Sequence, residues 1–98
     1  MTHDLKTHPE YFQAILDGVK TFELRKNDRG FQVGDVLHLE EWDPMTGRYT
    51  GREMWQTVTY ILSGPKAFGG LKEGYVIMAI GRIGNTWAAM MKEGQNEL

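Results

Sequence analysis

The sequence predicts one small α+β domain that is mostly β: a mostly antiparallel barrel with an early helix packed against it. Only one segment near the start has the helical period, whereas later segments are rich in β-branched and aromatic residues. Turn-forming Gly, Pro and Asn residues separate these segments. The length of 98 residues suits a single domain with one modest core.

The predicted helix covers residues 8–17. Thr7 and Glu10 have the spacing of a capping box, and Pro9 falls within the first turn. Gly18 fits the position that follows a helix C-terminus. The helix has one apolar face, formed by Tyr11, Phe12, Ile15, Leu16 and Val19.

Five segments are expected to be strands: residues 2–6, 20–25, 36–42, 49–62 and 75–83. In the third, Val36, His38 and Glu40 should share one face and Leu37, Leu39 and Glu41 the other. In the fourth, interrupted near Gly51, the residues expected on one face are Val58, Tyr60 and Leu62. Residues 63–74 are glycine-rich and are expected to form a loop.

The second predicted strand, residues 20–25, alternates polar and apolar side chains. If Phe22 and Leu24 face the core, then Thr21, Glu23 and Arg25 share the opposite face, with Lys20 at its mouth. Such a row is either an exposed, ion-paired sheet face or the floor of a site for a polar ligand.

Composition excludes several classes of function. The 11 Lys+Arg against 13 Asp+Glu argue against sequence-blind binding to long nucleic acid, although a local basic pocket stays possible. Cys is absent, and the three His residues are scattered, so we expect no metal site and no cofactor. No apolar run is long enough to cross a membrane and no signal peptide is evident, so a cytoplasmic protein is expected.

Two parts of unequal length are expected: a domain over residues 1–84 and a C-terminal tail over residues 85–98. Within the tail, residues 87–91 have enough apolar character for a turn or two of helix, and the last residues are polar.

A family resemblance rests mainly on the segment Gly18-x-Lys20-x-x-Glu23-x-Arg25, supported by Val33-Gly34-Asp35. This pattern resembles the ASCH domain of the PUA-like superfamily, and most of all a small uncharacterised family of ASCH-like proteins from bacteria and phages. The resemblance covers roughly residues 2–83. It implies a PUA-like β-barrel whose cleft, between the helix and the barrel, binds RNA or a nucleotide.

On this resemblance the ligand contacts are expected to come from cations, one carboxylate and aromatic rings. The expected RNA- or nucleotide-binding residues are Lys6, Lys20, Glu23, Arg25, Lys26, Arg29, Trp42 and Tyr75. Arginine matches phosphate or base edges, a carboxylate accepts from an exocyclic amine, and aromatic rings stack on bases.

Two other functions stay open. Some ASCH relatives are hydrolases, acting on N4-acetylcytidine or as ribonucleases, which would make Lys20, Glu23 and Thr21 the candidate catalytic residues. However, Glu23 stands where the amidohydrolase group has its threonine. The third possibility is a protein-interaction module, in which the tail residues Trp87, Met90 and Met91 contact a protein partner.

Overall fold

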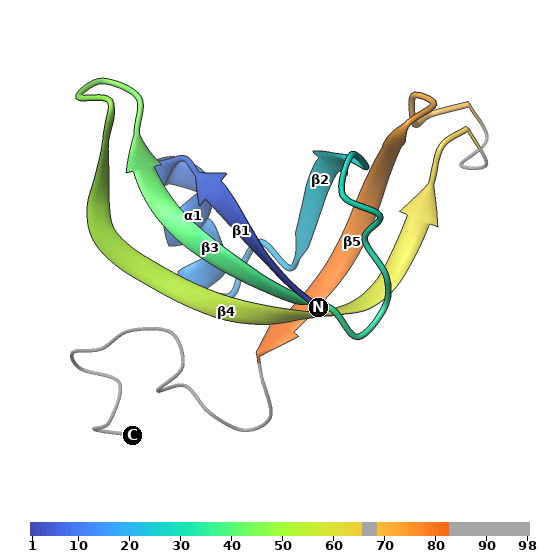
Figure 1. Cartoon of the computed structure of the whole chain (residues 1–98), viewed down its shortest axis with the longest axis horizontal. Helices are drawn as coiled ribbons and strands as arrows, with labels where there is room; N and C mark the ends of the chain where they lie inside the picture. Colours follow the sequence, from blue (N-terminus) through green and yellow to red (C-terminus); the bar gives the residue numbers. More distant parts are fainter. Residues whose placement is uncertain (66–68, 83–98) are drawn as a thin grey trace.

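A computed structural model of the chain describes residues 1–65 and 69–82 (Figure 1). The predicted tail helix at residues 87–91 lies outside the described residues. The chain forms one helix and five strands in the described part: β1 (Thr2–Thr7), α1 (Pro9–Leu16), β2 (Phe22–Lys26), β3 (Val36–Asp43), β4 (Arg48–Ser63) and β5 (Tyr75–Arg82). The prediction of a mostly β domain with one early helix is therefore confirmed.

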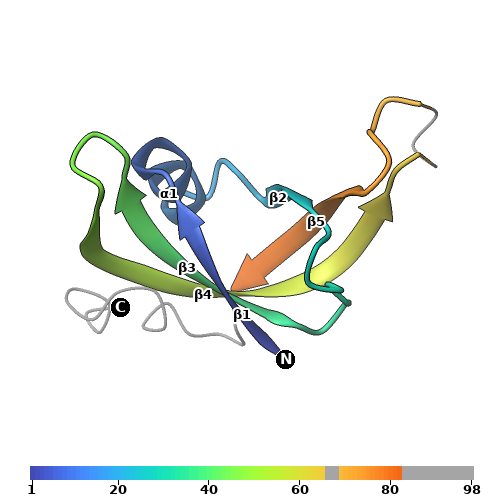
Figure 2. The ribbon, with the colours of Figure 1, turned by 45° about the horizontal axis from the view of Figure 1, so that its top comes forward.

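The five strands form one sheet in the order β1-β3-β4-β5-β2. The pairing of β1 with β3 is parallel, and the other three pairings are antiparallel. The sheet curls into a half-barrel, with β1 and β2 as its two edges and α1 between the two arms (Figures 1 and 2). Within the described residues, no helix is long and apolar enough to span a membrane.

The hydrophobic core fills the concave side of the sheet. Helix α1 contributes Phe12 and Ile15, and β3 contributes Leu37 and Leu39. Alternate residues of β3 face outward, as the sequence pattern predicts. The other core residues are Leu5, Phe31, Met54, Val58, Val76, Met78 and Ile80.

The helix begins differently from the prediction. Its N-cap is His8, whose side chain makes no capping hydrogen bond, and the Thr7 hydroxyl donates instead to the Leu5 carbonyl at 3.4 Å. The expected capping box is therefore wrong: Thr7 still belongs to β1, where its side chain is buried. The C-terminal prediction is confirmed, because Gly18 follows the C-cap Asp17 with φ of 81°, a conformation that favours glycine.

A half-buried arginine, paired with a buried glutamate, connects the helix to the sheet. The Arg52 side chain of β4 donates to both carboxylate oxygens of Glu41 in β3, at 2.9 and 3.0 Å, and also to Gln13 of α1 at 3.0 Å. The Arg52 guanidinium also lies 4.9 Å from the Phe12 ring centroid. The hydrogen bonds that the Glu41 carboxylate accepts from Arg52, together with one from Thr50, outweigh the effect of burial and lower the pKa of Glu41.

The face assignment in β4 is wrong beyond Val58. The β4–β5 register shifts between Val58 and Tyr60, which is a bulge, so Val58 is fully buried while Tyr60 is 62% exposed. One extra residue in a strand moves every later side chain to the opposite face. Strand β4 continues through Gly51, but the expected interruption is present as a register shift of the β3–β4 pairing at this point, where Gly51 has a φ of 98°.

The face assignment in β2 is also wrong, and this reversal matters for the site. Phe22 and Leu24 are 44% and 52% exposed, whereas Glu23 is 4% exposed. The register places Glu23 opposite Met78 and Arg25 opposite Val76, both of which face the core. Alternation fixes which residues share a face, but the neighbouring strand decides which face is inside.

Candidate functional site: the groove between the sheet edges

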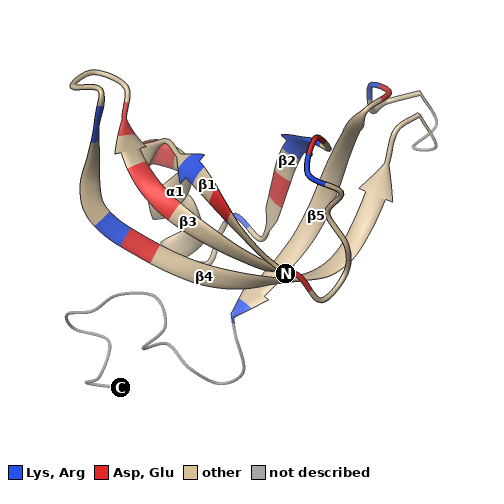
Figure 3. Cartoon of the chain, in the orientation of Figure 1, with Lys and Arg blue, Asp and Glu red and all other residues tan. Residues whose placement is uncertain are grey.

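Arginine side chains bridge the two edges of the half-barrel, which are not neighbours in the sheet. The Arg25 Nη2 atom of β2 donates to the Lys6 carbonyl of β1 at 2.9 Å. The Arg29 Nη1 atom, just beyond β2, donates to the Asp4 carbonyl at 2.9 Å. The opening is thus spanned by cationic side chains, and Figure 3 shows basic segments at the ends of both β1 and β2.

Beneath these bridges runs a groove formed by two adjoining hollows, of about 230 and 320 Å³, which share Tyr11, Glu23 and Leu24. We call it the seam groove. One wall comes from the end of β1 and the start of α1, and the other from β2 and the residues before it. It is lined by Lys6, Thr7, His8, Tyr11, Lys20, Phe22, Glu23, Leu24 and Arg25.

Glu23 is the central polar group of the seam groove. Its Oε1 atom lies 3.4 Å from Lys20 Nζ and 3.6 Å from Arg25 Nε. Its Oε2 atom is buried and has no hydrogen-bond partner. A buried acceptor without a donor costs about 1–3 kcal/mol. The reversed orientation of β2 therefore places an incompletely satisfied carboxylate between two cations.

Aromatic rings accompany these cations. The Lys20 ammonium donates to the Phe22 carbonyl at 2.7 Å and lies 4.8 Å from the Phe22 ring centroid and 5.6 Å from that of Tyr11. At the other end of the groove the Lys6 ammonium lies 4.6 Å from the Trp42 ring centroid. The seam groove thus combines flat apolar surfaces with charged groups.

The backbone of β2 also contributes to the groove. The Thr21 carbonyl accepts from the Ile80 amide of β5, whereas the Phe22 carbonyl accepts from the Lys20 side chain. Backbone groups of successive strand residues point to opposite sides. The backbone of Leu24 is therefore directed toward the groove, although its side chain is exposed on the outer face of the sheet.

A third hollow, of about 170 Å³, continues from the seam groove through Arg25, which lines both. We call it the cationic hollow. Its lining residues are Leu5, Arg25, Lys26, Asp28, Arg29 and Phe31. Of these, Asp28 is the one acidic residue, and its carboxylate lies 3.9 Å from Arg29 Nε.

Most of the ligand contacts expected from the sequence lie in or beside the seam groove. Lys6, Lys20, Glu23 and Arg25 line it, and Lys26 and Arg29 line the cationic hollow.

The remaining candidates lie elsewhere. Thr21 does not line the groove but a neighbouring hollow, together with Gln56 and Arg82; Lys20 lines both. Trp42 contacts Lys6 from outside the groove lining, and Tyr75 lies beyond it, next to the Lys72 ammonium.

Thr7 and His8 also line the groove, and sequence reasoning missed them. Both stand at the junction of β1 and α1. The sequence did contain a signal for these two residues, because a short strand that leads directly into a helix brings the end of the strand next to the first helical turn.

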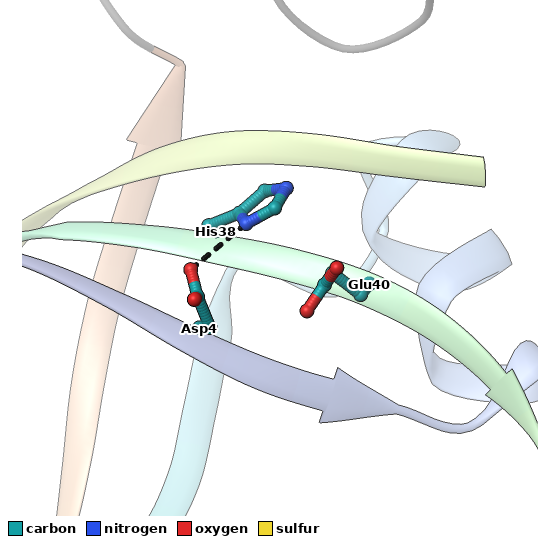
Figure 4. A group of neighbouring side chains, drawn as sticks. All are labelled: Asp4, His38 and Glu40. Atoms are coloured by element: carbon teal, nitrogen blue, oxygen red, sulfur yellow. Dashed lines mark hydrogen bonds and ion pairs between the residues drawn. The ribbon is translucent and has the colours of Figure 1, made fainter. Parts of the chain in front are cut away.

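A second cluster of titratable groups lies on the convex face, where the parallel register sets Asp4 opposite His38 (Figure 4). His38 Nδ1 lies 2.9 Å from Asp4 Oδ1, and Nε2 lies 2.7 Å from Glu53 Oε1. Burial alone would lower the pKa of His38, but these carboxylates outweigh it and raise the pKa above its usual value.

One ligand atom from each of Asp4, His38 and Glu40 falls within 4.8 Å of the others, close enough to hold a metal ion. The sequence suggested only scattered histidines, because the parallel pairing of β1 with β3 joins residues far apart in the chain.

Comparison with known proteins shows which family the domain belongs to. Residues 2–80 match a family described as "Domain of unknown function (DUF3850)". The chain belongs to the DUF3850 family. The match includes β1–β4 and most of β5, and with them every residue that lines the seam groove.

A curated relative of this DUF3850 chain comes from Escherichia phage P2 and is described as an uncharacterized 12.9 kDa protein in the GpA 3′ region. It is 42% identical over 57 residues, which are 58% of this chain and 50% of the relative. The chain thus spans about half the length of the curated relative that it matches.

Proposed function

We propose that this DUF3850 domain is a PUA-like barrel of the ASCH type, and that its seam groove binds single-stranded RNA or a nucleotide. The proposal rests on the surroundings of the Glu23 carboxylate. Its carboxylate is 4% exposed, has one oxygen without a donor, and lies between Lys20 and Arg25 in the floor of an open groove. A ligand that donates a hydrogen bond there recovers a cost that the free protein carries.

The chemistry around Glu23 suits a nucleotide better than a purely anionic or apolar ligand. Lys20 and Arg25 supply charge for phosphate, and Arg25 adds a planar fork. Tyr11 and Phe22 offer ring surfaces beside these cations. A carboxylate among the cations would repel a bare phosphate, whereas a base edge can donate to it.

Binding is proposed ahead of turnover because the groove lacks the expected hydroxyl nucleophile. Thr21 lines a neighbouring hollow, which shares Lys20 with the seam groove, and Glu23 replaces the threonine of the amidohydrolase pattern. The Thr7 hydroxyl also lines the groove, but it donates to the Leu5 carbonyl. The proposal therefore assigns Glu23 and Lys20 to ligand recognition.

Fluorescence anisotropy with a short, unstructured, labelled RNA tests the proposal. We expect saturable binding that weakens as salt rises from about 50 to 200 mM, because phosphate contacts release counterions. The variant Arg25→Ala should weaken binding by about tenfold or more.

The matched control is Arg48→Ala, which removes the same charge from the exposed first residue of β4, next to the hairpin that joins β3 and β4. It should leave affinity unchanged, and thermal unfolding verifies that both variants fold. If the wild-type protein binds neither RNA nor any mononucleotide, the proposed function is wrong.

A further inference from the structure

We infer that the seam groove selects bases whose Watson–Crick edge places an exocyclic amine next to an unprotonated ring nitrogen, as in cytosine and adenine, and holds the phosphate of the same nucleotide at the cationic hollow. This inference rests on the proposed function, because it names the ligand class of the same groove. It follows from how the charges are distributed around Glu23 and along β2.

The surroundings of the Glu23 carboxylate are asymmetric. Lys20 Nζ and Arg25 Nε both approach the same oxygen, Oε1, at 3.4 and 3.6 Å. The other oxygen, Oε2, has no donor. Donors therefore stand at one side of the carboxylate, and the oxygen at the other side is buried without a donor. Because the terminal torsion of Glu is broad, a base in the groove can meet this oxygen when the carboxylate turns.

A complementary ligand edge places an N–H donor beside a lone-pair acceptor. Cytosine offers its N4 amine next to N3, and adenine offers its N6 amine next to N1, so the amine meets the free oxygen while Lys20 or Arg25 meets the ring nitrogen. Uracil and hypoxanthine have a carbonyl oxygen in place of that amine. In the same pose, a carbonyl faces the carboxylate oxygen with no proton between the two acceptors. The ring N–H of uracil or hypoxanthine reaches that oxygen only if the base shifts across the groove.

The position of the ligand's phosphate is inferred from the cationic hollow. Arg25, Lys26 and Arg29 line it, and Arg25 connects it to the seam groove. From Glu23 to Lys26 the strand advances by three residues, about 10 Å at roughly 3.3 Å per residue. That span is of the order of one nucleotide. The Asp28 carboxylate also lines the hollow and opposes a phosphate there.

Calorimetric titration of the wild-type protein with cytidine and the monophosphates CMP, UMP, AMP and IMP tests both the base selection and the position of the phosphate. We expect CMP and AMP to bind about tenfold or more tightly than UMP and IMP, the discrimination that a base-edge contact provides. We also expect CMP to bind more tightly than cytidine.

Two variants assign these effects to residues. In Glu23→Gln the amide offers a donor as well as an acceptor, so the preference for CMP over UMP should fall toward equality while the gain from phosphate stays. In Asp28→Asn the affinity for CMP should rise and that for cytidine should not change, because the opposing charge is removed at the phosphate end only.

The outcomes separate the two levels of inference. Equal affinity for CMP and UMP in the wild-type protein overturns the base selection, and equal affinity for cytidine and CMP overturns the phosphate assignment. In both cases the proposed function stands. If none of these ligands and no short RNA binds, the proposed function fails as well. The wild-type comparisons do not depend on whether a variant folds.

Discussion

At the scale of single residues, the buried position of Glu23 is hard to explain by a contribution to the stability of the fold. It occupies an inward position between Lys20 and Arg25, yet one carboxylate oxygen lacks a donor. Natural domains usually keep buried polar groups satisfied, and exceptions concentrate at functional sites. An apolar side chain of similar size would fill the same space without the unpaired acceptor.

The variant Glu23→Met removes a buried acceptor that has no donor, but it also leaves Lys20 and Arg25 without their carboxylate. These effects oppose each other, so the free energy of unfolding should change by less than about 1 kcal/mol. The substitution should at the same time abolish nucleotide binding. Urea denaturation and calorimetric titration measure the two effects. A loss of several kcal/mol would mean that the two ion pairs of Glu23 are structural, which contradicts the ligand-binding role.

His38 gives a prediction about pH. On the convex face the groups around its ring are Asp4 of β1, Glu40 of β3 and Glu53 of β4, and the ring also stacks on Trp55. Its pKa is raised from 6.5, so the folded state binds the proton more tightly than the unfolded chain. The stabilisation is fully present below pH 6.5 and is lost as pH rises through the raised pKa.

The measurement is the free energy of unfolding of wild type minus that of His38→Gln, from mildly acidic to alkaline pH. The difference should be largest at the acidic end and shrink as pH rises. A difference that is constant, or that grows with pH, would show that the carboxylates do not hold a protonated imidazole.

At the scale of elements, α1 depends on its attachment to the sheet. The helix has only eight residues, too few to be stable alone. Phe12 and Ile15 provide its apolar contacts, and the Arg52–Glu41 pair adds a charged contact through Gln13. Because α1 forms one wall of the seam groove, a loosened helix would also disturb the proposed ligand site.

Arg52→Met should lower the free energy of unfolding by about 2–3 kcal/mol, because it leaves the buried Glu41 carboxylate without its cation. The control Arg48→Met removes an exposed arginine from the same strand and should change stability by less than about 0.5 kcal/mol. Chemical denaturation compares the two. Equal, small effects would mean that the ion pair does not fasten the helix.

At the scale of the whole molecule, a sheet that stops short of closure creates the site. Strands β1 and β2 are both edges, and arginine side chains rather than backbone ladders join them. Side-chain bridges leave room for a ligand, which paired strands would not. The free edges also leave backbone groups, such as those of Leu24, available at the groove.

The sequence predicted the elements well because each carries local signals. Helical spacing located α1, and Gly18 marked its end; β-branched runs located the strands. The motif also identified Lys20, Glu23 and Arg25, which all line the groove. These features depend on neighbours close in the chain, which a single sequence displays.

Other features depend on long-range pairing and were not predictable. The β2–β5 register turned Glu23 inward and Phe22 outward, and the bulge after Val58 reversed the end of β4. The parallel pairing of β1 with β3 brought His38 to Asp4. In each case a distant strand decided which side of a regular pattern faces the core.

Whether a nucleotide binds in the seam groove can be measured residue by residue, by NMR titration of the ¹⁵N-labelled protein with CMP. We predict saturable shifts of backbone amides at the two walls, residues 6–11 and 20–29, with Leu24 among them. Amides on the outer face, such as those of Tyr60 and Leu62, should not move. Shifts confined to the outer face, or no shifts at millimolar CMP, would contradict binding in the seam groove.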